Sequence, residues 1–156
     1  MRGLILACGI MLLGACDREP SSVKKYQADP PPMMANPVVH FEIPVNDIDR
    51  AVRFYEAVFG YTLRRDTVDG YAMAFFPRTD GGAGASGALA QGDVYKPAKS
   101  GPVLYFDVAD IDAVLARARA QGAKILYPKK DIGDAGFVAE IEDSEGNRIA
   151  LSEPKD

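Results

Sequence analysis

The chain contains a single histidine, His40, and an acidic residue, Glu42, stands two positions after it. In an extended strand, side chains two positions apart project from the same face. Histidine is the side chain that titrates closest to neutral pH, so together with the neighbouring carboxylate it could transfer protons. The alternative is a neutral imidazole that is hydrogen-bonded within the fold. His40 and Glu42 are therefore the candidate catalytic residues.

Other chemistry is limited by composition. One histidine and two cysteines, Cys8 and Cys16, cannot form a closed Cys/His zinc site, so a metal site would depend on carboxylates. With 22 acidic against 18 basic residues the net charge is −4. Such a chain has no basic surface for phosphates, which excludes nucleic acid as a partner.

The elements that would position these residues begin with a strand. Residues 38–45 alternate with period 2, which predicts a half-buried strand carrying His40 and Glu42. Asn46 and Asp47 then supply a helix cap, apolar residues follow at helical spacing, and Gly60 ends the helix. Three further strands are predicted at 61–66, 71–77 and 86–91. The order of this first unit is therefore βαβββ.

The same order recurs 63 positions later, where Asp110 and Ile111 stand in place of Asp47 and Ile48. A second helix follows, and strands are predicted at 123–127, 136–142 and 147–152. One helix over one short sheet leaves an apolar face uncovered, so the two units must fold together. The sequence predicts one α+β domain over residues 37–154, made of two βαβββ units whose strands form a curved mixed sheet.

A glycine-rich segment lies between two strands of the first unit. Gly82, Gly84 and Gly87 match the G-x-G-x-x-G pattern of dinucleotide-binding loops, but that pattern leads directly into a helix. Here a short strand follows instead, and Gly92 and Pro97 soon interrupt it. We therefore interpret the segment as a glycine hairpin.

These elements and their motifs resemble the vicinal oxygen chelate superfamily, which includes glyoxalase I, bleomycin-resistance proteins and extradiol dioxygenases. The resemblance spans residues 38–153 and rests on the sequences HFEIPV at 40–45, DIDRA at 47–51, FYE at 54–56, VFG at 58–60, YFDV at 105–108, DID at 110–112 and DSEGNR at 143–148. It implies that a sheet from each unit curls around a U-shaped cavity. In the metal-using members, four strands each supply one ligand to a divalent ion.

The resemblance also places the four ligand positions. The first falls on His40, while the other three fall on Ala88, Val103 and Ala150, which carry no donor atom. One imidazole, even assisted by Glu42, is too little to hold an ion that needs at least three protein ligands. We therefore predict no metal and no cofactor, and an enzymatic function is not favoured.

The cavity would instead have a mixed polar lining. The strand equivalent to that of His40 and Glu42 carries Tyr105 and Asp107, and the last strand carries Arg148. The five residues are the predicted ligand-binding set, facing one another across a hollow shared by both units. For each of them the alternative is a paired surface charge or a rim residue.

The N-terminal segment has the features of a targeting signal. Arg2 and the apolar run at 4–13 follow the pattern of a signal peptide, which would comprise residues 1–15. The run ends in Leu13-Gly14-Ala15-Cys16, which resembles a bacterial lipobox with Cys16 as the lipidated residue. Residues 16–36 are polar and proline-rich, as in a flexible linker. We expect a lipid anchor on the periplasmic side of the bacterial cell envelope, and Asp17 favours the inner membrane.

Three functions remain open. The first is metal-independent binding of a small organic molecule between the two units, as in bleomycin-resistance-type proteins. The second is a glyoxalase-type lyase or isomerase in which His40 and Glu42 act as base and partner. The third is an accessory lipoprotein that docks a protein partner, and a homodimer is possible in each case.

Overall fold

A computed structural model describes residues 37–79 and 81–155. The predicted signal peptide, the lipidation site Cys16, Asp17 and the rest of the polar segment 16–36 lie outside the described residues. Within the described part of the chain, no helix has both the length and the apolar character needed to cross a bilayer.

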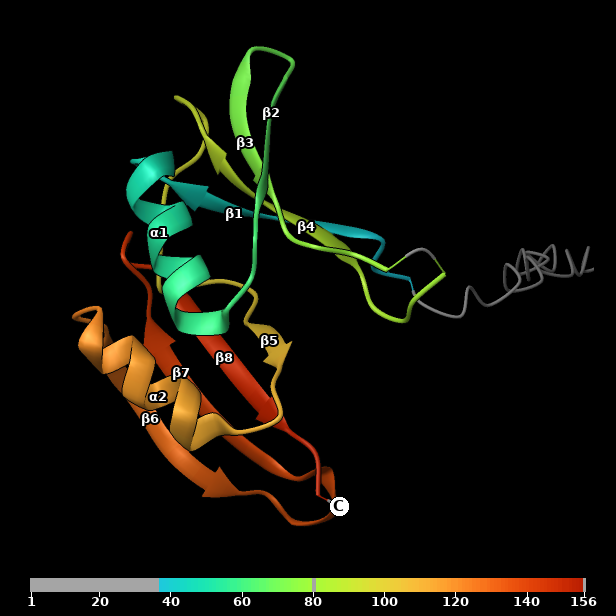
Figure 1. Ribbon diagram of the computed structural model, residues 1–156, viewed down its shortest axis with the longest axis vertical. Coiled ribbons are helices and arrows are strands. Elements are labelled where there is room, and N and C mark those ends of the chain that lie inside the picture. Colours follow the sequence, from blue (N-terminus) through green and yellow to red (C-terminus); the bar gives the residue numbers. More distant parts are fainter. Residues whose placement is uncertain (1–36, 80, 156) are drawn as a thin grey trace, which may run out of the picture. The chain divides into compact units, whose positions relative to one another are not determined.

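The first unit has the predicted βαβββ order (Figure 1). Its elements are β1 (His40–Val45), α1 (Ile48–Phe59), β2 (Arg64–Val68), β3 (Tyr71–Phe75) and β4 (Ser86–Gln91). The sheet order is β1-β4-β3-β2, and β1 runs parallel to β4. The Asp47 side chain accepts a hydrogen bond from the backbone N–H of Arg50 at 2.9 Å, and Gly60 ends α1 with a left-handed φ of 76°. The predicted cap and stop of the first helix are confirmed.

The second unit repeats this arrangement. It comprises β5 (Leu104–Asp107), α2 (Ile111–Ala120), β6 (Lys124–Asp131), a short 3₁₀ helix (Gly133–Ala135), β7 (Phe137–Glu142) and β8 (Arg148–Glu153). The sheet order is β5-β8-β7-β6, with β5 parallel to β8. Within the described residues, two α-helices and eight strands in two four-stranded mixed sheets confirm the predicted α+β class.

Two strand boundaries differ from the sequence prediction by more than two residues. Strand β2 begins at Arg64 rather than at Tyr61, because the Tyr61 ring stacks on Phe59 at 5.4 Å and the backbone N–H of Leu63 donates to Glu56 Oε1. Strand β6 extends beyond Tyr127 to Asp131, with register shifts on either side of Tyr127. The first difference arises from packing against the helix end and the second from irregular pairing with β7.

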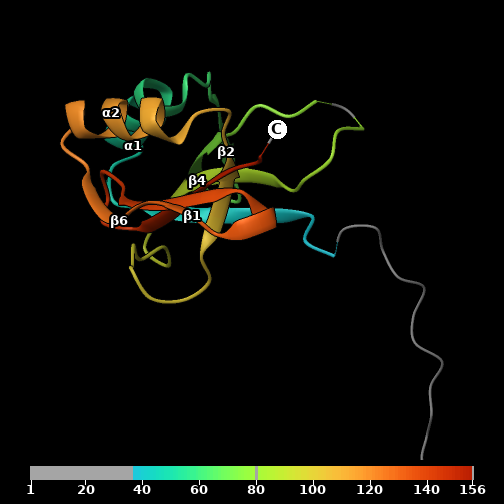
Figure 2. The same ribbon diagram turned by 90° about the horizontal axis from the view of Figure 1, so that it is seen from below.

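Both helices lie on the same side of the two sheets, as Figure 2 shows. The core lies between the helices and the sheets. Aromatic rings join the cores of the two units: Phe106 of β5 lies 5.0 Å from Phe59 and 6.2 Å from Tyr55, measured between ring centroids. Residues 92–103, which we call the linker, connect β4 to β5 on the side away from the helices. We call the sheet face on this side the open face.

A turn between β7 and β8 connects the units through hydrogen bonds. Its residues Asp143, Glu145 and Asn147 are buried. The Glu145 carboxylate accepts from the guanidinium of Arg50 at 2.7 and 2.8 Å, and Asn147 Nδ2 donates to the carbonyl of Pro44 at 2.9 Å. The turn of the second unit thereby holds the start of α1 and the end of β1 in the first.

Candidate functional site

His40 lies on the open face at the beginning of β1. Its Nδ1 lies 2.7 Å from Ser86 Oγ, and the Ser86 hydroxyl donates to the carbonyl of Val39 at 2.9 Å. Because the only hydroxyl hydrogen of Ser86 is used in that bond, Nδ1 of His40 must be the donor to Ser86. In a neutral ring this assignment leaves Nε2 unprotonated, and Nε2 faces Glu42 Oε1 at 3.8 Å. The geometry brings the two candidate catalytic side chains together.

Glu42 is held in turn by the linker. The hydroxyl of Tyr95 donates to Glu42 Oε2 at 2.8 Å, and this bond raises the pKa of Tyr95 above its ordinary value. The Tyr95 ring packs edge-on against Tyr71 at 5.4 Å. Tyr95 also covers the small apolar cluster of Met73, Ala88 and Ala90 on the open face of the first sheet. The linker therefore fixes the carboxylate and closes part of this face.

The residues at the four family ligand positions do not fit a divalent metal. Ala88 pairs with Glu42 across the first sheet and Ala150 pairs with Tyr105 across the second, and both alanines are fully buried. Their methyl groups and the Val103 side chain offer no donor. Among the residues that the structure describes, no group of three or more His, Cys, Asp or Glu side chains could hold a metal. His40 and Glu42 together supply fewer ligands than such a site needs.

Arg148 makes a two-pronged ion pair with Glu140. Its Nε and Nη2 donate to the two carboxylate oxygens at 2.8 and 2.6 Å. These hydrogen bonds raise the pKa of Arg148 above its ordinary value. The pair is on the open face of the second sheet, so Arg148 is a preorganised and largely neutralised donor.

One pocket, which we call the linker pocket, contains predicted residues of both units. Its volume is about 320 Å³. It is lined by Phe41, Glu42, Ile43, Pro44, Lys96, Ala98, Ser100, Pro102, Leu104, Asn147, Arg148 and Ile149. Glu42 and Arg148 thus share the walls of one mostly apolar pocket that the linker covers.

A second pocket, the aromatic pocket, contains the other two predicted residues of the second unit. Its volume is about 420 Å³. It is lined by Val38, Phe41, Tyr61, Phe76, Pro77, Ala83, Gly84, Ala85, Ser86, Gly87, Leu104, Tyr105, Phe106 and Asp107. The glycine-rich segment, which is a strand connection and does not lead into a helix, forms one wall.

The five predicted ligand-binding residues therefore do not share one hollow. Glu42 and Arg148 line the linker pocket, Tyr105 and Asp107 line the aromatic pocket, and His40 lines neither. The expected single hollow was wrong in this respect, because β1 and β5 belong to separate sheets and His40 is bonded to Ser86 at the far end of β1. Whether these residues bind a ligand stays a prediction.

Sequence reasoning missed several residues at this site. Tyr95 and Lys96 lie in the linker, which has no periodic pattern, and Glu140 is one of two acidic residues on its strand. Ser86 reaches His40 only through the parallel register of β1 and β4. The recurrence of glycine and proline around the linker was the only available signal, and it predicted a loop without its path.

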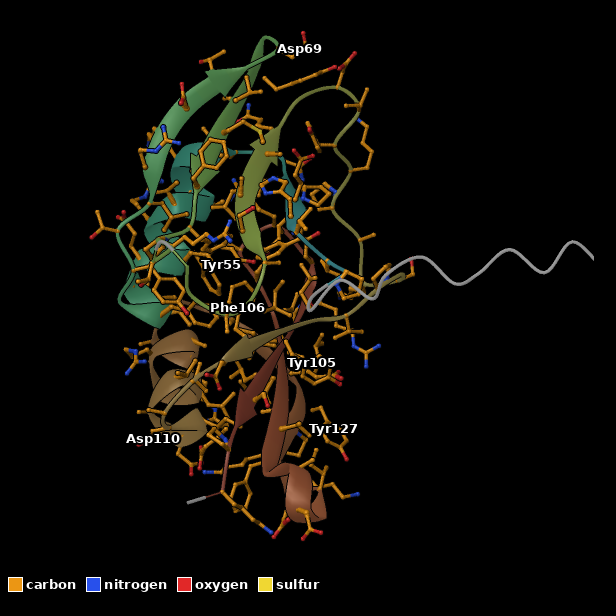
Figure 3. The ribbon with its side chains drawn as sticks, turned by 90° about the vertical axis from the view of Figure 1, so that its right-hand side faces the viewer. Tyr55, Asp69, Tyr105, Phe106, Asp110 and Tyr127 are labelled. Atoms are coloured by element: carbon orange, nitrogen blue, oxygen red, sulfur yellow. The ribbon has the colours of Figure 1, made fainter. Side chains whose placement is uncertain are left out.

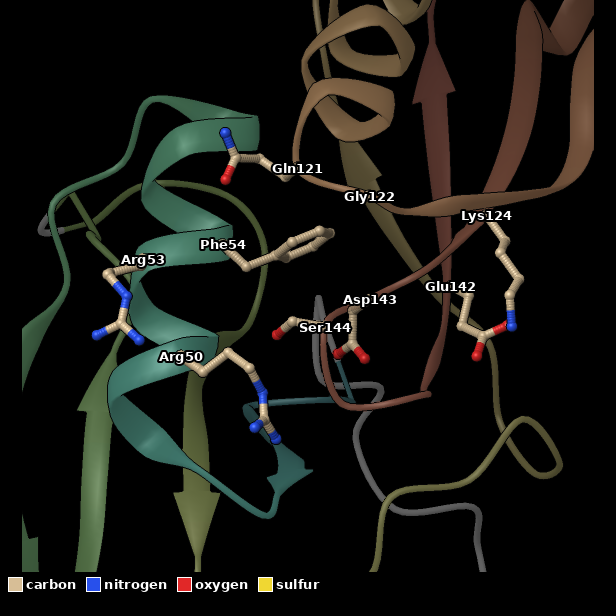
Figure 4. A pocket seen from close by; sticks show the side chains of 9 residues that line it. All are labelled: Arg50, Arg53, Phe54, Gln121, Gly122, Lys124, Glu142, Asp143 and Ser144. Atoms are coloured by element: carbon tan, nitrogen blue, oxygen red, sulfur yellow. The ribbon is translucent and has the colours of Figure 1, made fainter.

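A third pocket, of about 360 Å³, lies between α1, the end of α2 and the β7–β8 turn (Figure 4). Arg50 on its wall is paired with Glu145, and Glu142 Oε2 lies 2.7 Å from Lys99 Nζ. Figure 4 shows Arg53 directed away from Phe54 and Ser144. Of these ion pairs, Arg50–Glu145 connects the two units, and Lys99–Glu142 connects the linker to the second unit.

Comparison with known proteins supplies the context. Residues 38–151 match the family described as the Glyoxalase/Bleomycin resistance protein/Dioxygenase superfamily. The lactoylglutathione lyase of Haemophilus influenzae is 28% identical over 125 residues, covering 76% of this chain and 93% of that enzyme. The antibiotic-binding protein TnmS3 from Streptomyces sp. CB03234 is 27% identical with a TM-score of 0.58, covering 79% of this chain and 100% of TnmS3. Glyoxalase I of Leishmania major shares the fold at 24% identity and a TM-score of 0.59, covering 76% of this chain and 87% of that one.

Proposed function

Because the chain belongs to the Glyoxalase/Bleomycin resistance protein/Dioxygenase superfamily, we propose that it binds a small organic molecule in the linker pocket without a metal. One observation carries this proposal: Glu42 of the first unit and Arg148 of the second lie on the walls of the same mostly apolar pocket. Apolar walls with a few placed polar groups are typical of small-molecule sites. The resemblance to an antibiotic-binding protein supports binding as the function.

The charges of the linker pocket favour a ligand with an acidic group. Glu42 is engaged by Tyr95, and Arg148 is engaged by Glu140. Lys96, by contrast, has no hydrogen bond or ion pair to any residue that the structure describes. We expect a carboxylate on the ligand to meet Lys96 and the edge of Arg148 while its apolar part contacts Phe41 and Leu104.

In the experiment, the full chain is titrated with naphthalene-2-carboxylate and, separately, with its neutral amide, and binding is measured by isothermal titration calorimetry. We expect the carboxylate to bind more tightly, and the preference to disappear in Lys96→Gln. Lys130→Gln, which removes a charge from the exposed strand β6, is the matched control. Equal binding of the two probes to the wild-type protein, or equal effects of the two variants, would contradict the proposal.

A second candidate function is a lyase or isomerase reaction, favoured by the geometry of His40. Its Nε2 lies 3.8 Å from Glu42 Oε1, and the bond between Nδ1 and Ser86 Oγ fixes the ring. A base held in this way could remove a proton from carbon next to a carbonyl. The lactoylglutathione lyase relative supports testing this class of reaction. Turnover of a hemithioacetal of glutathione by the wild-type protein, lost in His40→Asn while ligand binding is retained, would establish this activity. No turnover by the wild-type protein would exclude that substrate.

We also propose that the chain is a lipoprotein of the bacterial cell envelope, anchored through Cys16 on the periplasmic side. The support is the sequence Leu13-Gly14-Ala15-Cys16 after an apolar run. Acyl chains contribute about 0.8 kcal/mol per buried CH₂ to membrane binding. Cys16→Ser should shift the protein from the detergent phase to the aqueous phase in a partitioning experiment. Unchanged partitioning of the variant would refute the anchor.

A further inference from the structure

The walls of the aromatic pocket are the faces and edges of several rings. Phe76 lies 5.8 Å from Phe41 and 5.5 Å from Phe106, measured between ring centroids, and Tyr61 lies edge-on to Phe76 at 6.1 Å. Phe41, Phe76 and Tyr61 are only partly buried against the core. Part of each ring is therefore available to a molecule in the pocket.

Gly87 keeps one of these walls in place. A Cβ atom at this position of β4 would overlap the Phe41 ring. The outer end of the Phe41 ring thus lies directly against the strand backbone, and the same residue lines the pocket. The aromatic wall is preorganised by close packing and does not depend on a ligand to order it.

The pocket has one sign of charge. Its lining includes the carboxylate of Asp107 and the phenols of Tyr61 and Tyr105, and among the described residues that line it there is no lysine, arginine or histidine. Asp107 has no ion pair with a cation in the described part of the chain. Burial, together with the charge of Asp107, raises the pKa of Tyr61, so this phenol is neutral at physiological pH. The linker pocket differs, because it contains Lys96 and Arg148 as well as the carboxylate of Glu42.

From this geometry we infer a second ligand site, in the aromatic pocket, for a small organic cation that has an apolar or aromatic body. Aromatic faces attract cations through the ring quadrupole. The carboxylate of Asp107 adds a charge partner at the edge of the rings, and no basic side chain among the described wall residues repels the ligand. The two pockets share Phe41 and Leu104 on their walls, but their charged side chains differ, and this inference does not depend on the function proposed for the linker pocket.

The test compares 2-phenylethylammonium with 2-phenylethanol, two probes that differ only in the terminal group. Binding to the full chain is measured by ligand-observed NMR titration. We expect the cation to bind about tenfold more tightly than the alcohol, and Asp107→Asn to weaken cation binding about fivefold while alcohol binding stays the same.

Asp69→Asn is the matched control. Asp69 occupies the tip of the β2–β3 hairpin with a positive φ of 49°, a conformation that asparagine also tolerates, and Figure 3 shows it well away from Tyr105 and Phe106. This variant removes the same charge and should leave cation binding unchanged. Tyr105→Leu, at a position that is 58% exposed, removes a ring from the rim without disturbing the core and should weaken cation binding.

Three results would overturn the inference. They are equal affinity for the two probes, an effect of Asp69→Asn as large as that of Asp107→Asn, and cation binding that Lys96→Gln alone changes. The last result would assign the cation to the linker pocket. Because the acidic probe of the linker pocket and the cation used here are different molecules, the two proposals can fail separately.

Discussion

Replacing Glu145 by glutamine tests whether one buried carboxylate holds the two units together. Its side chain is fully buried. It accepts five hydrogen bonds: from Arg50 Nε and Nη2 at 2.8 and 2.7 Å, from the backbone N–H groups of Asn46 and Asp47 at 3.0 and 3.1 Å, and from Ser144 Oγ at 3.0 Å. All of these donors except Ser144 belong to the first unit, whereas Glu145 belongs to the second.

The size of the effect follows from these bonds. Glutamine keeps one carbonyl oxygen but places an NH₂ group against the remaining donors, so at least one charge-assisted bond is lost. A hydrogen bond to a charged group contributes about 1.5–3 kcal/mol. Arg50 is 48% exposed, so water replaces part of what it loses. We expect the free energy of unfolding to fall by about 2 kcal/mol.

The pH dependence gives a second readout. Burial disfavours the charged form of Glu145, but the hydrogen bonds from Arg50, Ser144 and the two backbone N–H groups outweigh it, and its pKa lies below the ordinary value of 4.5. A carboxyl with a lowered pKa stabilises the folded state above its ordinary pKa, and this contribution is lost as the pH falls through the folded-state value. The difference in unfolding free energy between wild type and variant should be constant near neutral pH and should shrink below pH 4.5.

The assay is urea unfolding of the full chain followed by circular dichroism at several pH values. Asp66→Asn is the control, because Asp66 forms an ion pair with Arg64 at 2.7 Å in which both side chains are exposed. Such a pair contributes little to stability. If Glu145→Gln costs no more than Asp66→Asn, or if its cost does not change in acid, the reasoning about this contact between the units is wrong.

Three further predictions concern packing, buried polar groups and metal content. Gly87→Ala should lower the unfolding free energy by about 1–3 kcal/mol, because the new methyl group displaces the Phe41 ring; an unchanged urea midpoint would contradict this. Tyr55→Phe should cost about 1–2 kcal/mol, because the buried Tyr55 hydroxyl donates to Asp143 Oδ2 at 2.9 Å; Tyr55→Leu, which also loses the ring, should cost more. Elemental analysis of the chain purified without chelator should give well below one metal ion per chain, whereas one ion that is lost in His40→Ala would contradict the residue argument.

Local patterns in the sequence were enough to predict the elements and their order. The caps at Asp47 and Asp110 and the stop at Gly60 depend on hydrogen bonds and backbone angles within a few residues, so they can be read along the chain. The repeat of 63 positions predicted that both units would share one topology. The absence of donor atoms at Ala88, Val103 and Ala150 was likewise evident from residue type, and the structure adds that the two alanines are buried.

The division of the site into two pockets depends on tertiary structure. His40 forms a hydrogen bond with Ser86, 46 positions away, because β1 and β4 pair in parallel. Glu42 accepts a hydrogen bond from Tyr95, 53 positions away, because the linker crosses the open face. Tyr105 and Asp107 share the strand alternation that suggested one cavity, yet the separate sheets place them on the aromatic pocket. Periodicity determines which face of a strand a side chain occupies, but the path of loops and the packing of sheets decide what that face meets, because those contacts join residues far apart in the chain.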